Sequence, residues 1–100
     1  MDSQIKFMWD EDKNIANLKK HKVDFNDAVR AFYDPNRIDL FDDQHSTLEE
    51  TRWIYLGSAA GAVLFVVEAE PAENTVRIIS ARPALKHEKE VYYANCNANS

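Results

Sequence analysis

The sequence predicts an α+β domain with two N-terminal helices, an antiparallel β-sheet meander and one C-terminal helix. Asp10 and Asp24 each precede a stretch in which apolar residues recur at helical spacing, and another such stretch lies near the end of the chain. Between residues 37 and 82, four segments of strand character are separated by polar or turn-forming sequences. Helices and strands that are segregated along a chain in this way are typical of a two-layer α+β domain.

The first expected element is a short strand over residues 5–9, and a helix follows it. The Asp10 side chain is placed to accept hydrogen bonds from the unpaired N–H groups at the start of this helix, which runs to about His21. Acidic residues in its first turn and lysines in its last turn match the helix dipole. Ile15 and Leu18 give this helix a narrow apolar face.

A second helix is expected over residues 25–33, with Asp24 as its N-cap. Apolar positions at helical spacing are expected to face the core: Phe25, Ala28, Val29 and Phe32. The proline and asparagine that follow, Pro35 and Asn36, end the helix.

Four segments predict the sheet. Alternation of apolar and polar residues indicates a strand with one solvated face, whereas an apolar segment without alternation indicates a central strand covered on both faces. The predicted strands are residues 37–42, 51–58, 62–70 and 75–82, of which 62–70 is the central one. A polar loop at 43–50 separates the first two of these strands.

A third helix is expected over about residues 84–95. Pro83 is placed in its first turn, because proline lacks the N–H group that this turn leaves unpaired. Residues 96–100 show no periodicity and are expected to form a frayed tail. A single domain would therefore span residues 1–95.

Composition limits the classes of protein to consider. With 45% apolar residues in a chain of 100, the sequence can form one hydrophobic core. Its longest apolar run, Ala62 to Val67, is far shorter than the roughly 20 residues that span a bilayer, and the N-terminus lacks the features of a secretory signal. The single cysteine, Cys96, excludes an intrachain disulfide and fits a reducing compartment. We therefore expect a cytoplasmic protein without membrane contact.

The charge of the chain is unevenly distributed. The formal net charge is −5, and residues 1–50 contain twelve Asp and Glu against seven Lys and Arg, whereas residues 51–100 contain five of each class. A basic group lies within the second half: Arg77, Arg82, Lys86 and Lys89. This distribution allows a local basic cleft on an acidic body, and such a body suits a basic protein partner.

Arg82 is the first candidate for anion binding. Regular alternation would place it with Ser80 on one face of its strand and Arg77 on the other, so the two arginines are not expected to form one clamp. Arg82 stands at the end of the strand and before a helix N-terminus, where a guanidinium group suits a phosphate. The alternative is an ordinary ion pair with a neighbouring carboxylate.

His45 and the end of the first helix supply further candidates. His45 lies in an acidic loop and is a candidate general acid or base, the alternative being a solvated loop residue. Lys20 and His21 are possible phosphate contacts, or else a solvated helix end. No histidine or cysteine spacing is typical of a metal site, and two glycines cannot build a phosphate-binding loop, so neither metal nor cofactor is expected.

Four spaced segments, taken together, resemble the BrnT family of type II toxins. In order over about residues 6–93, they are KFMWDEDKNIANLKKHKVDF, AFYDP, DDQHSTLEETRWIYLG and VRIISARPALKHEKEVYY. The family is similar in fold to RelE-like ribonucleases, and its members inhibit translation by cutting RNA. The resemblance implies a BrnA-like antitoxin with a ribbon-helix-helix domain, and contact with operator DNA only through that antitoxin.

The resemblance also implies roles for individual residues. The implied catalytic residues are Arg82, His45 and Arg52. The implied or candidate contacts to RNA phosphate are Lys20, His21 and, in the basic group of the second half, Lys86. In metal-free cleavage a base removes the 2′-hydroxyl proton, a cation stabilises the phosphoryl oxygens and an acid protonates the leaving 5′-oxygen. Arg82 is the expected cation and His45 the expected acid or base.

One position departs from the family pattern. Glycine usually follows the lysine–histidine pair, whereas this chain has Lys22. Glycine would permit a left-handed end to the helix, so Lys22 must either be strained or bend the chain differently.

Two functions of other classes remain open beside RNA cleavage. The chain could be a catalytically inactive relative that binds an antitoxin and adjusts repression, and the acidic surface is compatible with that function. Binding of RNA without cleavage is disfavoured by the acidic first half.

Overall fold

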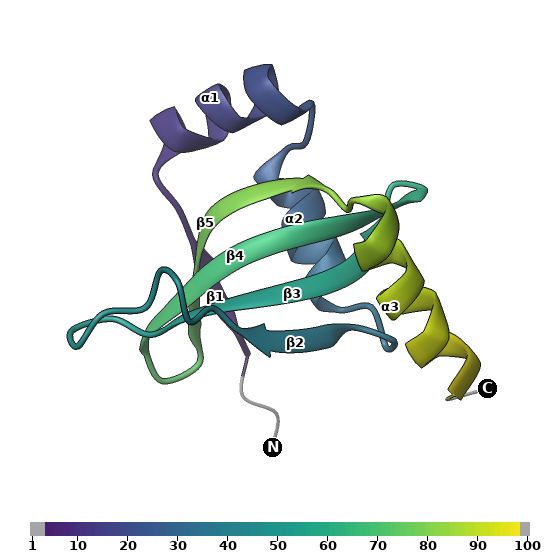
Figure 1. Ribbon diagram of the computed structural model, residues 1–100. Coiled ribbons are helices and arrows are strands. Elements are labelled where there is room, and N and C mark those ends of the chain that lie inside the picture. Colours follow the sequence, from purple (N-terminus) through teal and green to yellow (C-terminus); the bar gives the residue numbers. More distant parts are fainter. Residues whose placement is uncertain (1–3, 99–100) are drawn as a thin grey trace.

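The computed structural model, which describes residues 4–98, contains a five-stranded sheet and three helices (Figure 1). The helices are α1 (Glu11–His21), α2 (Phe25–Phe32) and α3 (Lys86–Ala98). The strands are β1 (Lys6–Met8), β2 (Ile38–Phe41), β3 (Arg52–Ala59), β4 (Ala62–Ala72) and β5 (Thr75–Pro83). The α+β class is therefore confirmed, and none of the described helices is long and apolar enough to cross a membrane.

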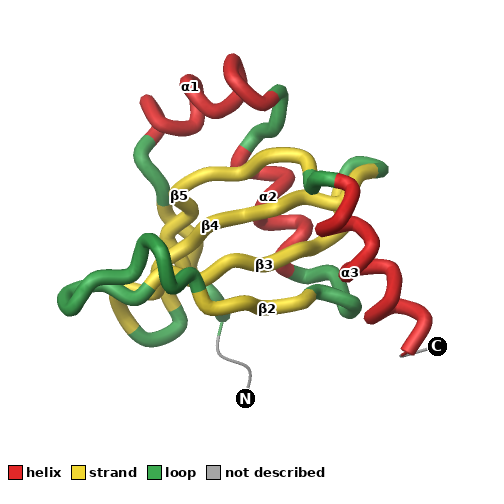
Figure 2. The backbone as a smooth tube through the Cα atoms, viewed as in Figure 1, coloured by secondary structure: helices red, strands yellow, loops and turns green. Residues whose placement is uncertain are grey.

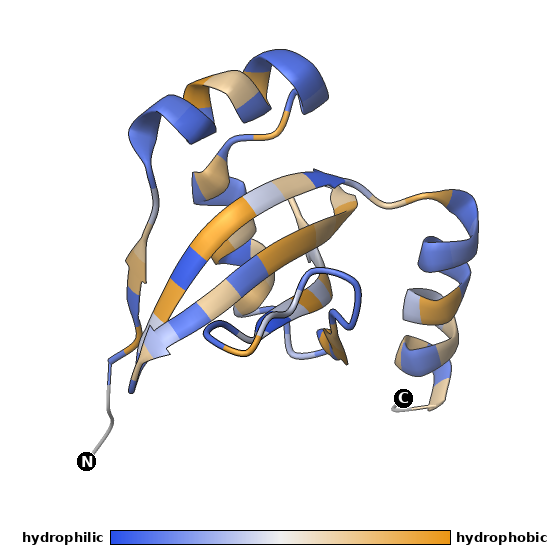
Figure 3. Ribbon diagram, turned by 60° about the vertical axis from the view of Figure 1, so that its left-hand side comes forward, coloured by the Kyte–Doolittle hydropathy of each residue, from blue (hydrophilic) through white to orange (hydrophobic). Residues whose placement is uncertain are grey.

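The strand order is β1-β5-β4-β3-β2, and the tube in Figure 2 shows β5, β4, β3 and β2 side by side. Strands β2 to β5 form the predicted antiparallel meander, and β4 lies at its centre. The short β1 adds a parallel strand beside β5, with Lys6 opposite Thr75, so the complete sheet is mixed. Figure 3 shows apolar and polar residues alternating along the strands, while α1 is mostly hydrophilic.

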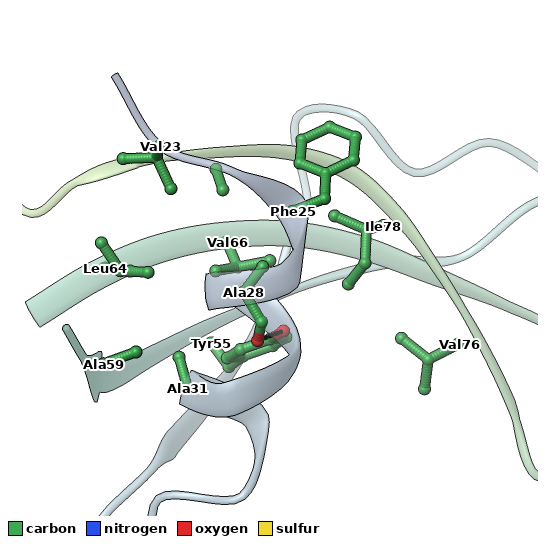
Figure 4. Close-up of a cluster of buried hydrophobic side chains, with 11 residues drawn as sticks. Val23, Phe25, Ala28, Ala31, Tyr55, Ala59, Leu64, Val66, Val76 and Ile78 are labelled. Atoms are coloured by element: carbon green, nitrogen blue, oxygen red, sulfur yellow. Dashed lines mark hydrogen bonds between the residues drawn. The ribbon is translucent and has the colours of Figure 1, made fainter. Parts of the chain in front are cut away.

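Helix α2 covers one face of the sheet with small side chains at the contact. Phe25, Ala28 and Ala31 are fully buried against the strands (Figure 4), and the Tyr55 hydroxyl donates a hydrogen bond of 2.6 Å to the Ala28 carbonyl. A Cβ atom at Gly57 would lie 2.3 Å from the Ala31 carbonyl oxygen. The helix therefore packs directly on the backbone of β3. Of its predicted apolar stripe, Phe25 and Ala28 are fully buried and Phe32 packs half-buried against the core, whereas Ala31 takes a place at the contact that was not predicted.

Helix α1 contacts β5 through asparagines and not through its apolar residues. Ile15 and Leu18, which form the narrow apolar face of this helix, are 50% and 44% exposed. The buried Asn17 side chain instead donates to the Ala81 carbonyl at 2.8 Å and accepts from the Ala81 N–H at 3.1 Å. Because β1 pairs only with the first part of β5, the main chain at Ala81 needs this side-chain partner.

Helix α3 packs on the opposite face, and it begins later than predicted. Pro83 is the last residue of β5, opposite Leu64, so the prediction that it opens the helix was wrong. The Glu88 carboxylate accepts the Leu85 N–H at 2.7 Å, and this bond defines the helix start at Lys86. The helix continues to Ala98, three residues past the predicted end at 95, so residues 96–98 do not form the expected frayed tail. Residues 99–100 of that tail lie outside the described part of the chain.

Strand β5 contains a bulge. Val67 of β4 lies opposite Ser80, but the next residue, Glu68, lies opposite Ile78. Ile79 is therefore an extra residue on β5, and such a residue shifts the alternation of side chains between the two faces.

The bulge places Arg77 and Arg82 on the same face of the sheet. Arg77 lies opposite Ala69 and Arg82 opposite Phe65, and these two β4 residues are four positions apart in a strand that pairs regularly with β3. The prediction that the two arginines lie on opposite faces was wrong, because it assumed an uninterrupted strand.

Candidate active site

A cavity of about 400 Å³ lies on the sheet face that carries the two arginines. Strands β3, β4 and β5, the loop after β2 and the end of α1 all contribute to it. Its lining residues are His21, Asp42, Gln44, His45, Ile54, Phe65, Val67, Ser80 and Arg82. The loop that carries His45 lies in front of the strands in Figure 3.

The guanidinium of Arg82 is fixed on two sides. It stacks over the Phe65 ring, with 3.9 Å from Cζ to the ring centroid, and pairs with both carboxylate oxygens of Glu88 at 2.9 and 3.0 Å. The hydrogen bonds from Arg82 lower the pKa of the Glu88 carboxyl against the effect of its burial. A planar guanidinium held in this orientation presents a fork that a phosphate can also bind.

His45 and Asp42 form a hydrogen-bonded pair at the same cavity. Asp42 is buried, and its Oδ2 lies 2.9 Å from Nδ1 of His45, whose side chain is 61% exposed. A proton on Nδ1 that is donated to Asp42 leaves Nε2 as the basic nitrogen. This arrangement is that of a histidine oriented by a carboxylate to exchange protons with a bound molecule.

His21, which lines the cavity, is the last residue of α1, and the residue that follows it is left-handed. Lys22 has φ of 62° and ψ of 27°, and its N–H donates to the Leu18 carbonyl at 2.9 Å. Lys22 thus adopts the conformation that glycine would adopt at this helix end. Of the two alternatives expected for Lys22, a strained backbone and a different bend of the chain, the structure has the strained backbone.

Arg52 and Arg77 share one carboxylate beside the cavity. Glu50 Oε1 lies 3.1 Å from Nε of Arg52, and Oε2 lies 2.6 Å from a terminal nitrogen of Arg77. Both arginines lie opposite Ala69, one from each neighbouring strand. Their hydrogen bonds lower the pKa of the Glu50 carboxyl, Arg77 having the larger effect.

The structure brings together three of the six residues proposed from the sequence. Arg82, His45 and His21 line one cavity. Arg52 lies on the same sheet face but at the adjoining ion pair. The side chains of Lys20 and Lys86 are exposed and do not line the cavity.

Other residues of the site were not identified as such from the sequence. The acidic context of His45 pointed to Asp42 without distinguishing it from the neighbouring carboxylates. Glu88 could have been found from the sequence as the third residue after the helix N-cap, because a glutamate at that position often accepts a hydrogen bond from the N-cap N–H group. Arg77 could not be assigned to this face of the sheet from the sequence, because no residue type in β5 indicates the bulge.

Among the described residues, no group of three or more His, Cys, Asp or Glu side chains is arranged to hold a metal ion. The ionisable groups that line the cavity are a guanidinium, two imidazoles and a carboxyl group. These groups can exchange protons and bind an anion.

Comparison with known proteins agrees with this fold. Residues 9–88 match the model of the family described as the ribonuclease toxin BrnT of type II toxin–antitoxin systems. No curated protein matches. Among solved structures, the 1.1 Å crystal structure of the Brucella abortus ribonuclease toxin BrnT is similar, with 24% sequence identity and a TM-score of 0.61. The match covers 83% of this chain and 100% of that one.

The fold and the family match define the class as a ribonuclease toxin of a type II toxin–antitoxin system. Within that class, the chain belongs to the BrnT family, because the family model covers most of its length. A toxin of this type has an antitoxin as its partner.

Proposed function

We propose that this toxin is a metal-independent endoribonuclease that inhibits translation in the cytoplasm, and that it cleaves RNA in the cavity shared by Arg82 and His45. The observation that carries the proposal is the convergence of an oriented imidazole and a fixed guanidinium on one cavity. The matched family supports cleavage of RNA as the activity.

His45 is the base in this mechanism. Its Nε2 takes the proton of a 2′-hydroxyl, Asp42 stabilises the imidazolium that forms, and the 2′-oxygen attacks the adjacent phosphorus. The bond from phosphorus to the 5′-oxygen breaks, and His21, as an imidazolium, protonates the leaving oxygen. The products are a 2′,3′-cyclic phosphate and a 5′-hydroxyl.

Arg82 stabilises the negative charge that grows on the phosphoryl oxygens, an effect worth roughly 10²–10³-fold for a single donor in other enzymes. Glu88 pairs with this guanidinium. The phosphate therefore competes with Glu88 or takes a guanidinium edge that the carboxylate leaves free. Arg52, Lys20 and Lys86 are proposed as outer contacts along the RNA backbone, since none of them lines the cavity.

The antitoxin is proposed to be BrnA-like, with a ribbon-helix-helix domain that carries all contact with operator DNA. The net charge of −5 supports this division of roles, because an acidic toxin is poorly suited to bind DNA itself.

The test is induced expression of the toxin and of its Arg82→Ala and His45→Ala variants, with growth and total RNA as readouts. Growth arrest with RNA breakdown is expected for the parent and not for either variant. Equal soluble protein and equal melting temperatures serve as controls for folding. Full toxicity of Arg82→Ala would overturn its assigned role.

The second candidate function is an inactive toxin relative that only binds the antitoxin. The ion pair between Arg82 and Glu88 favours it, because a carboxylate already fills the guanidinium fork. Intact RNA after soluble expression of the parent, together with tight antitoxin binding, would establish this function.

A further inference from the structure

A second cavity of about 200 Å³ lies at the β2 edge of the sheet. Its lining residues are Phe32, Arg37, Asp39, Trp53, Glu68 and Glu70. Trp53 and Glu68 are directly opposite each other and lie on the α2 side of the sheet, with Tyr55. This cavity is therefore on the opposite face from the proposed ribonuclease site, where Ile54 and Val67 point.

The carboxyl group of Glu68 is buried at this cavity, and one of its oxygens lacks a hydrogen-bond partner. The residue is 3% exposed, and its Oε1 is the one buried side-chain oxygen or nitrogen in residues 4–98 that has no hydrogen-bond partner. Burial, and then the charge of Glu70, raise the pKa of Glu68 to about 8. The buried carboxyl is satisfied either by a proton, which it can share with Glu70, or by a cation from outside.

The arginine at this cavity is already engaged elsewhere. Arg37 pairs with Asp39 at 2.9 Å, donates to the Phe32 carbonyl at 2.6 Å and stacks 4.0 Å above the Phe32 ring. Its charge is thus largely matched by Asp39. Glu68 and Glu70 are therefore left without a cation among the residues that line the cavity.

The walls and the rim of the cavity suit a long basic side chain. The rings of Phe32 and Trp53 provide apolar contact for an alkyl stem, while the carboxyl groups receive its charged end. At the rim, Phe41 is 52% exposed and packs edge-on against Trp53, with 5.6 Å between ring centroids. Phe41 belongs to β2, whose outer edge has no partner strand among the described residues.

We infer that this cavity binds a lysine or arginine side chain of the antitoxin, in a segment that lies along the β2 edge. Charge complementarity supports the occupant, because the toxin carries a net charge of −5 and the first half of its sequence holds the acidic excess. An exposed strand edge with a neighbouring aromatic side chain is a common docking site for a protein segment. The site lies apart from the RNA cavity, so the antitoxin can be held without occupying it.

Entry of a cation couples binding to pH. The groups that face Glu68 are Glu70 on its own strand, Tyr55 on β3, Asp39 on β2 and Arg37 before β2. A bound ammonium or guanidinium favours the carboxylate, so binding releases the proton. Antitoxin affinity should therefore rise with pH below about 8, by at most tenfold per pH unit for one proton.

The test is calorimetric titration of the toxin with its cognate antitoxin between pH 6 and pH 9, using wild type, Glu68→Gln and Glu73→Gln. The glutamine amide in Glu68→Gln resembles the neutral carboxyl in shape, and Glu73 is an exposed carboxylate in the β4–β5 turn. Wild type and Glu73→Gln are expected to gain affinity with pH. Glu68→Gln is expected to lose at least roughly tenfold at pH 8 and to show little pH dependence.

A small probe tests the chemistry of the cavity itself. Titration with n-butylguanidinium chloride should shift the indole signal of Trp53 in the wild-type NMR spectrum and not in that of Glu68→Gln. Equal antitoxin affinity of wild type and Glu68→Gln at every pH would overturn the inference, whether or not the probe binds. RNA cleavage should be unchanged in Glu68→Gln. The titration measures antitoxin binding alone, so it remains a valid test even if the wild-type toxin does not cleave RNA.

Discussion

Lys22 has a backbone conformation that an L-residue adopts at a cost. Its φ of 62° ends α1 and directs the chain toward α2. We expect Lys22→Gly to raise the free energy of unfolding by about 0.5–1 kcal/mol, because relief of the left-handed strain outweighs the greater freedom of glycine in the unfolded chain. Urea denaturation followed by circular dichroism measures the change.

Lys19→Gly is the matched control for this variant. Lys19 is an exposed residue in the same helix with helical backbone, so glycine there should destabilise by about 1 kcal/mol. Destabilisation by both variants would show that Lys22 is not strained.

Glu68 makes the stability of the domain depend on pH in an unusual direction. Its folded-state pKa of about 8 exceeds the value of 4.5 expected for the unfolded chain. Between these values the folded state binds more protons, so the free energy of unfolding falls as pH rises and reaches its lower limit above about 8. We expect Glu68→Gln to remove this loss and to be more stable than wild type at pH 9 by on the order of 2 kcal/mol.

Thermal unfolding of both proteins at pH 5 and pH 9 provides the comparison. Similar stability is expected at pH 5, where the carboxyl is neutral in the folded state. Glu70→Gln should lower the pKa of Glu68 and give a smaller effect in the same direction, since Glu70 is the second cause of the shift. A stability difference between Glu68→Gln and wild type that does not change with pH would contradict the raised pKa of Glu68.

At the scale of elements, the contact between α2 and β3 depends on the absence of a side chain at one position. A methyl group at Gly57 would lie 2.3 Å from the Ala31 carbonyl oxygen and 3.0 Å from its carbonyl carbon, and backbone atoms cannot rotate away. We expect Gly57→Ala to lower the free energy of unfolding by about 1–3 kcal/mol as the helix is displaced. Chemical denaturation measures the loss.

The neighbouring residue Ser58 provides the control for Gly57. Its side chain is exposed on the same strand, so Ser58→Ala should change the free energy of unfolding by less than about 0.5 kcal/mol. Equal stability of Gly57→Ala and wild type would mean that α2 does not approach β3 this closely.

Elements that depend on local sequence were predicted with good bounds. Asp10 and Asp24 accept N–H groups at the starts of α1 and α2, as their positions in the sequence indicated. The apolar residues of α1 do not indicate its contact face, because its partner is an unpaired stretch of β5 main chain that pairs with the amide of Asn17. This pairing follows from β1 being short, which only the assembled sheet reveals.

In the candidate site too, residues that local sequence indicates were predicted, whereas a residue whose position depends on the assembled sheet was not. Arg82 and His45 were found from their chemistry and from family resemblance, and both line the cavity. Arg77 was assigned to the wrong face, because one extra residue in β5 reverses the alternation and that residue, Ile79, is an ordinary strand former.

At the scale of the whole molecule, an acidic protein presents a face on which arginines are matched by carboxylates. Glu50 pairs with Arg52 and Arg77, and Glu88 pairs with Arg82. With the net charge of −5, this pairing limits the attraction of the free toxin for RNA. Removal of one of these carboxylates should therefore strengthen RNA binding.

We expect Glu50→Gln to bind RNA more tightly than wild type and with a steeper dependence on salt. Neutral glutamine frees the charge of Arg52 and Arg77, and each additional phosphate that these arginines neutralise should steepen the slope of log K against log salt by about 0.7. Fluorescence anisotropy with a 2′-O-methyl RNA oligonucleotide, which lacks the attacking hydroxyl, measures affinity without cleavage. Glu49→Gln removes the same charge from the adjacent exposed position and should alter the slope less. Equal slopes for Glu50→Gln and wild type would mean that RNA does not reach Arg52 and Arg77, and would confine the RNA path to the cavity of Arg82.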